Sequence, residues 1–144
     1  MNRRPIHRNT SDPEGTFVDY MLNDLPKYVS SKINCINIGK VTSKNDSKHE
    51  CNVQLLPLQL DGQKAPVISR AIVPASIWYQ DEINKKIARK LEIEYKQLFK
   101  VGSVVAIGFF DREIDNWSGS KNYKIESDRM HSLNDPVILG VIKQ

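Results

Sequence analysis

The hydrophobic positions of the chain fall into short runs of strand length that polar turns separate. Residues 33–43 and 51–55 alternate apolar and polar side chains, whereas residues 66–73, 104–110 and 137–142 are nearly continuous apolar runs. Alternation is typical of a half-buried strand, and short runs rich in Val, Ile and Phe are typical of buried strands. We therefore predict five strands over these ranges.

The strand pattern contains two irregularities near the start of the chain. Gly39 lies inside the first predicted strand and predicts a bend or a bulge there. After the second strand the apolar phase slips by one residue, and Leu56, Leu58 and Leu60 continue on the other parity. Such a slip indicates a bulge or a turn onto a second face. Residues 44–49 have the composition of a turn.

Two segments have a helical period instead. Residues 15–28 form an amphipathic helix whose stripe comprises Phe17, Met21, Leu25 and Tyr28, with Tyr20 beside it. We expect Pro26 to break or kink this helix. Residues 77–99 form a second helix, which is charged over residues 81–98 and whose stripe comprises Ile83, Ile87, Leu91, Tyr95 and Leu98. Trp78 lies at its entrance.

The order of elements predicts a mainly β fold. Three strands, a helix and two further strands suit a five-stranded barrel of the oligonucleotide/oligosaccharide-binding (OB) type, with an N-terminal helix and a helix between strands 3 and 4. A ferredoxin-like sandwich would need a helix between the first two strands, and an SH3-like barrel has no room for the long helix. We expect residues 1–14 to be a flexible arm, residues 15–32 an N-terminal helical segment and residues 33–144 the OB-fold domain.

Composition narrows the protein class only slightly. The 144 residues are 40% hydrophobic, which suits one core with polar extensions, and no apolar run approaches the roughly 18 residues of a membrane span. The N-terminus lacks the apolar stretch of a secretory signal, so we expect synthesis in a cytoplasm. The net charge of +4 permits nucleic-acid binding, and part of it comes from Arg3, Arg4 and Arg8 in the arm.

The sequence contains no recognisable metal or redox motif. Cys35 and Cys51 are too far apart in the predicted pairing for a disulfide, and we expect both to be small buried hydrophobes. His7, His49 and His131 do not have zinc-ligand spacing. We therefore expect no cofactor, no metal and no small-molecule substrate.

The 26 residues 111–136 carry many charges and little apolar periodicity, and they lie between two buried strands. A loop of this length usually carries function. Its acidic residues Asp111, Glu113 and Asp115 could perform acid–base or metal chemistry. They could instead form an ion-pair cluster that pins the loop to the barrel or holds a neighbouring subunit. No phosphate-binding glycine loop and no His–carboxylate spacing accompanies them, which favours the ion pairs. Trp117 could stack on a base or pack against the barrel edge.

Two segments of this loop resemble bacteriophage baseplate central-spike proteins. The N-terminal OB domain of that family carries a hydrophobic strand followed by Asp-Arg-x-x-Asp-x-Trp, and later an Arg-x-His-x-Leu-x-Asp segment before the last strand. The corresponding positions here are Asp111, Arg112, Asp115 and Trp117, then Arg129, His131, Leu133 and Asp135. In outline the resemblance extends upstream to residues 39–41, 52–54 and 56–58, which are similar to the family's first two strands.

The resemblance implies a homotrimer around a tail axis. The interface or loop-clamp residues would be Asp111, Arg112, Asp115, Trp117, Arg129, His131 and Asp135. Family members usually join strands 3 and 4 by a glycine-rich loop and continue into a trimeric needle, whereas this chain has a charged helix and ends at Gln144. We therefore expect a collar whose needle or tip is on another chain or truncated. Candidate contacts with hub or tube proteins are Arg3, Arg4, Arg8, Phe17, Tyr20 and Trp78.

Three functions remain open at this point. The first is a non-enzymatic structural component of a phage or phage-like tail baseplate spike, located in the virion tail and assembled in the bacterial host cytoplasm. It would link the tail tube or hub to the cell-puncturing tip. The second is a cytoplasmic OB module that binds single-stranded nucleic acid. The third is a small hydrolase that uses Asp111, Asp115 or His131.

Overall fold

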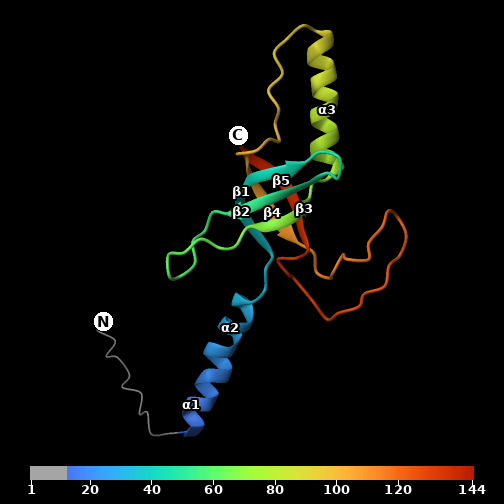
Figure 1. The fold of residues 1–144 in the computed structure, drawn as a ribbon. Helices are drawn as coiled ribbons and strands as arrows, with labels where there is room; N and C mark the ends of the chain where they lie inside the picture. The colour runs from blue at the N-terminus through green and yellow to red at the C-terminus, as the bar shows by residue number, and fades with distance from the viewer. Residues whose placement is uncertain (1–12) are drawn as a thin grey trace, which may run out of the picture. The chain divides into compact units, whose positions relative to one another are not determined.

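The computed structural model describes residues 13–144 (Figure 1). By its internal contacts the chain divides into two units, one ending at Ile33 and one comprising Asn34–Gln144. The first unit is helical and the second contains all five strands. Each unit is described by itself below. The predicted arm of residues 1–14 lies outside the described residues except for its last two, because the first helix already begins at Pro13.

The N-terminal unit is one helical run with an altered middle turn. Helix α1 spans Pro13–Asp19, a π-helical turn η1 spans Tyr20–Asp24, and α2 spans Leu25–Ser31. Pro26 has no N–H, and inside an α-helix its ring would clash with the carbonyl four residues earlier. The wider π turn, in which the N–H of Leu25 donates to the carbonyl of Tyr20, precedes it. The predicted break is thus a π turn inside a continuous helical run.

The second unit is a closed barrel, as predicted. Its strands are β1 (Ile36–Asn45), β2 (Glu50–Leu55), β3 (Ile68–Ile72), β4 (Val104–Phe109) and β5 (Pro136–Lys143). They pair in the order β1-β2-β3-β5-β4, and β4 closes onto β1. Every pair is antiparallel except β3 with β5. A five-stranded barrel with a helix between β3 and β4 is consistent with the OB type.

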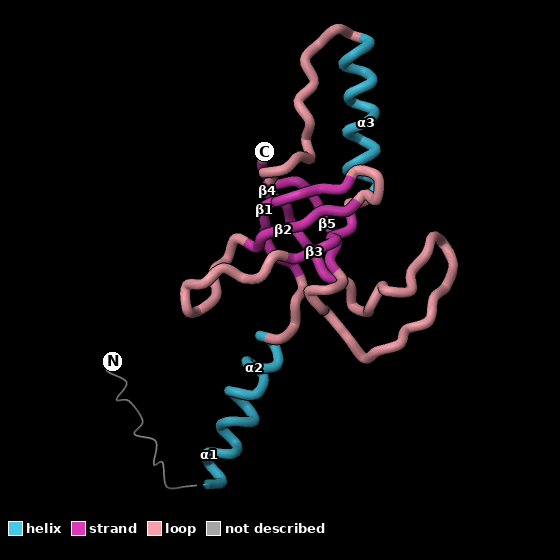
Figure 2. Tube along the Cα trace, viewed as in Figure 1, coloured by secondary structure: helices cyan, strands magenta, loops and turns pink. Residues whose placement is uncertain are grey.

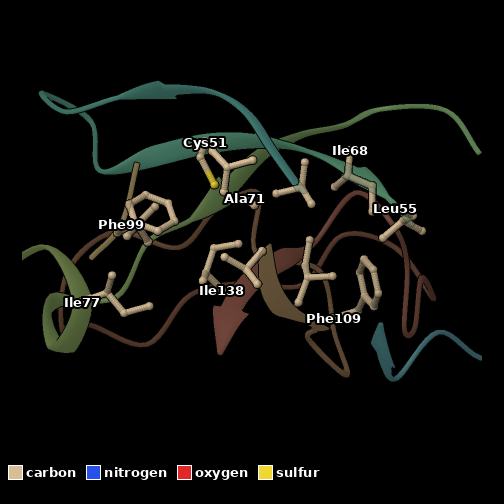
Figure 3. Packing of buried hydrophobic residues seen from close by; sticks show 13 residues of the cluster. Cys51, Leu55, Ile68, Ala71, Ile77, Phe99, Phe109 and Ile138 are labelled. Carbon is tan, nitrogen blue, oxygen red and sulfur yellow. The ribbon is translucent and has the colours of Figure 1, made fainter. Parts of the chain in front are cut away.

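The barrel interior is filled by alternate side chains of the strands. Val41, Val53, Val105, Ile107 and Ile138 are completely or almost completely buried. Figure 3 shows the surrounding side chains converging between the strands: Cys51, Leu55, Ile68, Ala71, Ile77, Phe99, Phe109 and Ile138. In β2 inward residues alternate with outward ones, as the period-two pattern of its sequence predicts. In β3 the buried Ile68 and Ala71 are three residues apart, because the β2–β3 register shifts between them.

The irregularities of the first two strands differ from those predicted. In β1 the register shifts between Val41 and Ser43, so the bulge is not at Gly39. Gly39 lies where β1 and β2 approach closely, and a Cβ there would collide with Cγ1 of Val53. The prediction that the apolar pattern of β2 continues on the other face of the strand after Leu55 is wrong. Leu56, Leu58 and Leu60 are exposed in the β2–β3 connection, because the strand ends at Leu55 and only a single bridge, Leu58 with Lys64, follows.

Helix α3 spans Ala75–Lys90, so the predicted helix over residues 77–99 is correct in place but too long. The chain turns at Glu92, which has a positive φ of 55°, and returns towards the barrel (Figures 1 and 2). Asp81 explains the return. Its carboxylate accepts hydrogen bonds from the Tyr95 hydroxyl at 2.5 Å and from the N–H groups of Leu98 and Phe99 at 3.0 and 2.9 Å.

This turn also removes part of the predicted apolar stripe. Ile87 and Leu91 are exposed, whereas Ile77, Asp81 and Ala88 are the buried residues of the helix. Phe99, which lies beyond the end of α3, is buried in the barrel core. Phe99 can reach the core because residues 91–99 run back to the barrel as an extended segment and do not continue the helix.

The two thiols have different environments. Both Cys35 and Cys51 are free, so the prediction that they do not pair is confirmed. Cys51 is buried as predicted, but Cys35 is exposed, because it precedes β1 at the rim of the barrel unit. Among residues 13–144, none of the helices combines the length and the hydropathy that a membrane crossing needs.

Candidate functional site

The candidate site is the long loop between β4 and β5, which Figure 2 shows leaving the barrel. Its two ends are held together at the barrel wall. The N–H of Phe110 donates to the carbonyl of Asp135 at 2.9 Å, and the N–H of Asp135 donates to the carbonyl of Ser132 at 3.1 Å. Asp135 is completely buried and directly precedes Pro136, the first residue of β5. The loop is therefore closed at its base by residues of the strand ends.

Arg129 connects the two halves of the loop. Its Nε and one terminal nitrogen donate to the two carboxylate oxygens of Asp135, both at 2.8 Å. The same terminal nitrogen donates to Asp115 at 2.9 Å. The carboxylate of Asp135 also accepts the N–H of Ile114 at 3.1 Å. Hydrogen bonds to Asp135 and then to Asp115 raise the pKa of Arg129 above its ordinary value, so this cation is permanent.

Glu113 forms a second connection between the halves, and sequence reasoning did not single it out as a buried anchor. It is almost completely buried. Its carboxylate accepts hydrogen bonds from the hydroxyl and N–H of Ser127 and from the N–H of Glu126. The Ser127 hydroxyl, followed by the Glu126 N–H, lowers the pKa of Glu113. Its charged side chain carries no apolar signal in the sequence, so only the fold reveals its burial.

His131 provides a third connection. Its Nε2 lies 2.9 Å from a carboxylate oxygen of Asp111, at the start of the loop. The carbonyl of His131 accepts a hydrogen bond from the side-chain amide of Asn34 at 2.9 Å. Nδ1 of His131 is buried and has no hydrogen-bond partner among the described residues. Asn34 fastens the loop to the segment before β1, although nothing in its sequence context predicts this role.

The structure brings together five of the seven predicted loop residues. Asp111 pairs with His131 and Asp115 pairs with Arg129, so these two pairs join the segment 111–117 to the segment 129–135. Arg129 also pairs with Asp135, within the second segment. Arg112 and Trp117 are exposed, and within residues 13–144 no hydrogen bond or ion pair joins either side chain to another side chain. A contact of these residues between subunits stays a prediction.

The predicted partner-binding residues lie in three places. Phe17 and Tyr20 are exposed on the N-terminal helical unit. Trp78 is partly buried against the barrel core and stacks on the ring of His49, with 3.9 Å between ring centroids. Arg3, Arg4 and Arg8 lie outside the described residues.

The chemistry that this loop can perform is limited because Asp111, Asp115 and His131 are already paired within the loop. The Asp111–His131 contact resembles the base half of a nucleophilic site, but the described hydrogen bonds of His131 include no hydroxyl or thiol. Within residues 13–144 no group of three or more His, Cys, Asp or Glu side chains is placed to hold a metal ion. The observed contacts hold two loop segments in one shape.

No family model matches the chain, and no curated protein matches it.

Proposed function

We propose that this protein is a structural component of a phage or phage-like tail baseplate spike. In this role it is an OB-type collar that links the tail tube or hub to a cell-puncturing tip. Its copies associate as a trimer around the tail axis. The proposal rests on the resemblance of the loop segments and on how these segments are arranged in the fold.

The observation that carries the proposal is the position of Arg129 between Asp115 and Asp135. Asp115 belongs to the first resemblance segment, and Arg129 and Asp135 belong to the second. Bidentate Arg–carboxylate pairs are geometrically specific, so they hold a loop in one conformation. The two segments are therefore held together as one structure, which supports a single role for both of them in assembly.

The outer surface of the loop supports association between copies. Ile125, Met130 and Leu133 are exposed, as are Arg112 and Trp117. Exposed apolar side chains are available for contacts between copies, and Arg is enriched at the core of protein–protein interfaces. Since the charged pairs are already satisfied within the loop, contacts between copies in this proposal come from these exposed residues.

The barrel also suits a component that transmits axial force. All five strands of the described residues pair around the closed barrel, with β3 and β5 joined through one residue pair, Ile72 with Val137. The two halves of the long loop are joined to each other at three points, through Asp135, Glu113 and His131. The loop is tied to the barrel unit by the hydrogen bonds of Phe110 with Asp135 and of Asn34 with His131. A closed and internally fastened unit resists shear between its elements.

The test is the mass of the protein in solution and in assembled particles. We expect light scattering to give three times the mass of one chain. The double substitution Met130→Asp with Leu133→Asp should reduce this to one chain without lowering the melting temperature by more than a few degrees. Leu60→Asp, at a fully exposed position of the β2–β3 connection, is the matched control and should remain trimeric. A stable monomer in solution and in particles would contradict the proposal.

A nucleic-acid-binding role is distinguished by its salt dependence. Binding to phosphates releases counterions, so the affinity for a single-stranded oligonucleotide would fall steeply with salt concentration. Neutralising Arg3, Arg4 and Arg8 would abolish such binding if that function were correct. Under the spike proposal the same substitutions leave the trimer intact.

A further inference from the structure

A hollow of about 540 Å³ lies beside the barrel and is bordered by Trp78 and Trp117; we call it the two-tryptophan hollow. Five parts of the barrel unit contribute to it: the β1–β2 turn, strand β2, strand β3, the start of α3 and the β4–β5 loop. In OB barrels, the face of strands 2 and 3 and these two loops bind oligonucleotides or oligosaccharides. The volume falls within the roughly 300–1,000 Å³ of small-ligand sites.

One wall of the hollow is built from a stacked pair of rings. The rings of His49 and Trp78 are 3.9 Å apart and inclined by only 8°. His49 has a positive φ of 53°, and its carbonyl accepts the N–H of Val73 at 2.8 Å. Trp78 is packed against the buried core. The wall is therefore fixed in place before any ligand arrives, which reduces the entropy that binding costs.

Another part of the lining is a bulged residue of β3. Arg70 has a positive φ of 55°, and its N–H donates to the side chain of Asn52 at 3.1 Å, where the β2–β3 register shifts. Bulges next to binding sites redirect a side chain. Within residues 13–144, four non-glycine residues have a positive φ, and both Arg70 and His49 line this hollow. Such backbone conformations concentrate at ligand sites.

The charges of the lining define the class of ligand. Lys48 and Arg70 are balanced by Glu50 and Asp115, and Asn134 adds an uncharged amide. A polyanion would need an excess of cations along its path, which this lining lacks. A purely apolar ligand would leave these polar groups without partners. A sugar ring matches both features, because it has apolar faces for an indole and a rim of hydroxyl groups for hydrogen bonds.

We propose that the two-tryptophan hollow binds an uncharged oligosaccharide of two or three rings. One ring stacks on Trp117, whose side chain is half exposed. Asp115, Asn134 and Arg70 supply donors and acceptors for the hydroxyl groups. This inference rests on the barrel unit alone. It assigns Trp117 to the ligand, so the contacts between copies in the proposed tail function would come from the other exposed residues of the loop, Arg112, Ile125, Met130 and Leu133.

The test is titration calorimetry of the full-length chain with triacetylchitotriose, cellotriose and maltotriose as probes. At least one of them should bind with a Kd below about 1 mM and change the tryptophan fluorescence. Trp117→Ala should weaken this binding at least tenfold. Tyr79→Ala is the matched control, since Tyr79 is an exposed aromatic that contacts Trp78 edge-on but does not line the hollow. It should change the Kd less than twofold.

Three results would overturn the inference. The first is the absence of heat and of any fluorescence change with all three trisaccharides at 10 mM. The second is saccharide binding that Trp117→Ala leaves unchanged, which would place the ligand elsewhere. The third is tighter binding of a ten-residue oligothymidylate that depends on Trp117 and on salt, which would make the hollow a nucleic-acid site. The oligomeric state measured for the proposed function affects none of these readouts.

Discussion

Arg129 donates two hydrogen bonds to the carboxylate of Asp135. Its Nε and one terminal nitrogen each lie 2.8 Å from a different carboxylate oxygen. Asp135 is completely buried, whereas the Arg129 side chain is 26% exposed. The buried carboxylate thus depends on one cation at the surface and on the N–H of Ile114. Because Asp135 leads directly into β5, this pair couples the shape of the loop to the barrel.

Replacing Arg129 by Ala should lower the free energy of unfolding well beyond the change in the surface control below, because it leaves a buried carboxylate without its cation. Arg129→Lys should lose an intermediate amount, since a lysine keeps the charge but cannot donate in the bidentate geometry. Urea unfolding followed by circular dichroism measures both losses. Lys121→Ala, at an exposed position of the same loop, is the control and should stay within about 0.5 kcal/mol of the wild type. An equal stability for Arg129→Ala would refute the coupling.

Glu113 should make the stability depend on pH in the acid range. Its pKa is lowered in the folded state from its ordinary value of 4.5, so the unfolded chain binds the proton first. The stabilisation is therefore complete above pH 4.5 and is lost as the pH falls towards the folded-state pKa. Unfolding free energies between pH 3 and pH 7 should decline more steeply with acid in the wild type than in Glu113→Gln. Glu126→Gln should follow the wild-type curve.

The two thiols should differ in reactivity. Burial raises the pKa of the Cys51 thiol to about 12, so almost no thiolate is present at pH 8. Cys35 is exposed. We expect Ellman's reagent to modify one thiol per native chain at pH 8 and two in guanidinium chloride. Cys35→Ser should abolish the native reaction, and two fast-reacting thiols in the native protein would contradict the burial of Cys51.

Gly39 and Gly140 offer a matched pair of glycine substitutions in the barrel. A Cβ at Gly39 would collide with Val53 and lie 3.1 Å from the carbonyl oxygen of Gln54, whereas a Cβ at Gly140 would meet no atom within 4 Å. Gly39→Ala should cost about 1–3 kcal/mol through overpacking. Gly140→Ala should be nearly neutral or stabilising, because alanine restricts the unfolded chain. Thermal unfolding of both variants checks the difference, and equal melting temperatures would contradict it.

The barrel was predictable because its signals are local. Period-two alternation in β2 and the apolar runs of β4 and β5 mark strands without reference to any other part of the chain. The placement of a helix between β3 and β4 followed in the same way. The exposed positions of Leu58 and Leu60 were not predictable, because an apolar residue in a connecting loop has the same sequence signal as one in a strand.

The sequence by itself determined where the five strands lie, their OB-type order and the polar loop that joins the last two. Only the tertiary structure decided that α3 ends at Lys90, that Glu113 is buried and that Arg129 pairs with Asp135. The reason is the range of the forces involved. Periodicity is set by neighbours within a few residues, whereas the partners of Asp81, Glu113 and Asp135 are chosen by the folded backbone that surrounds them.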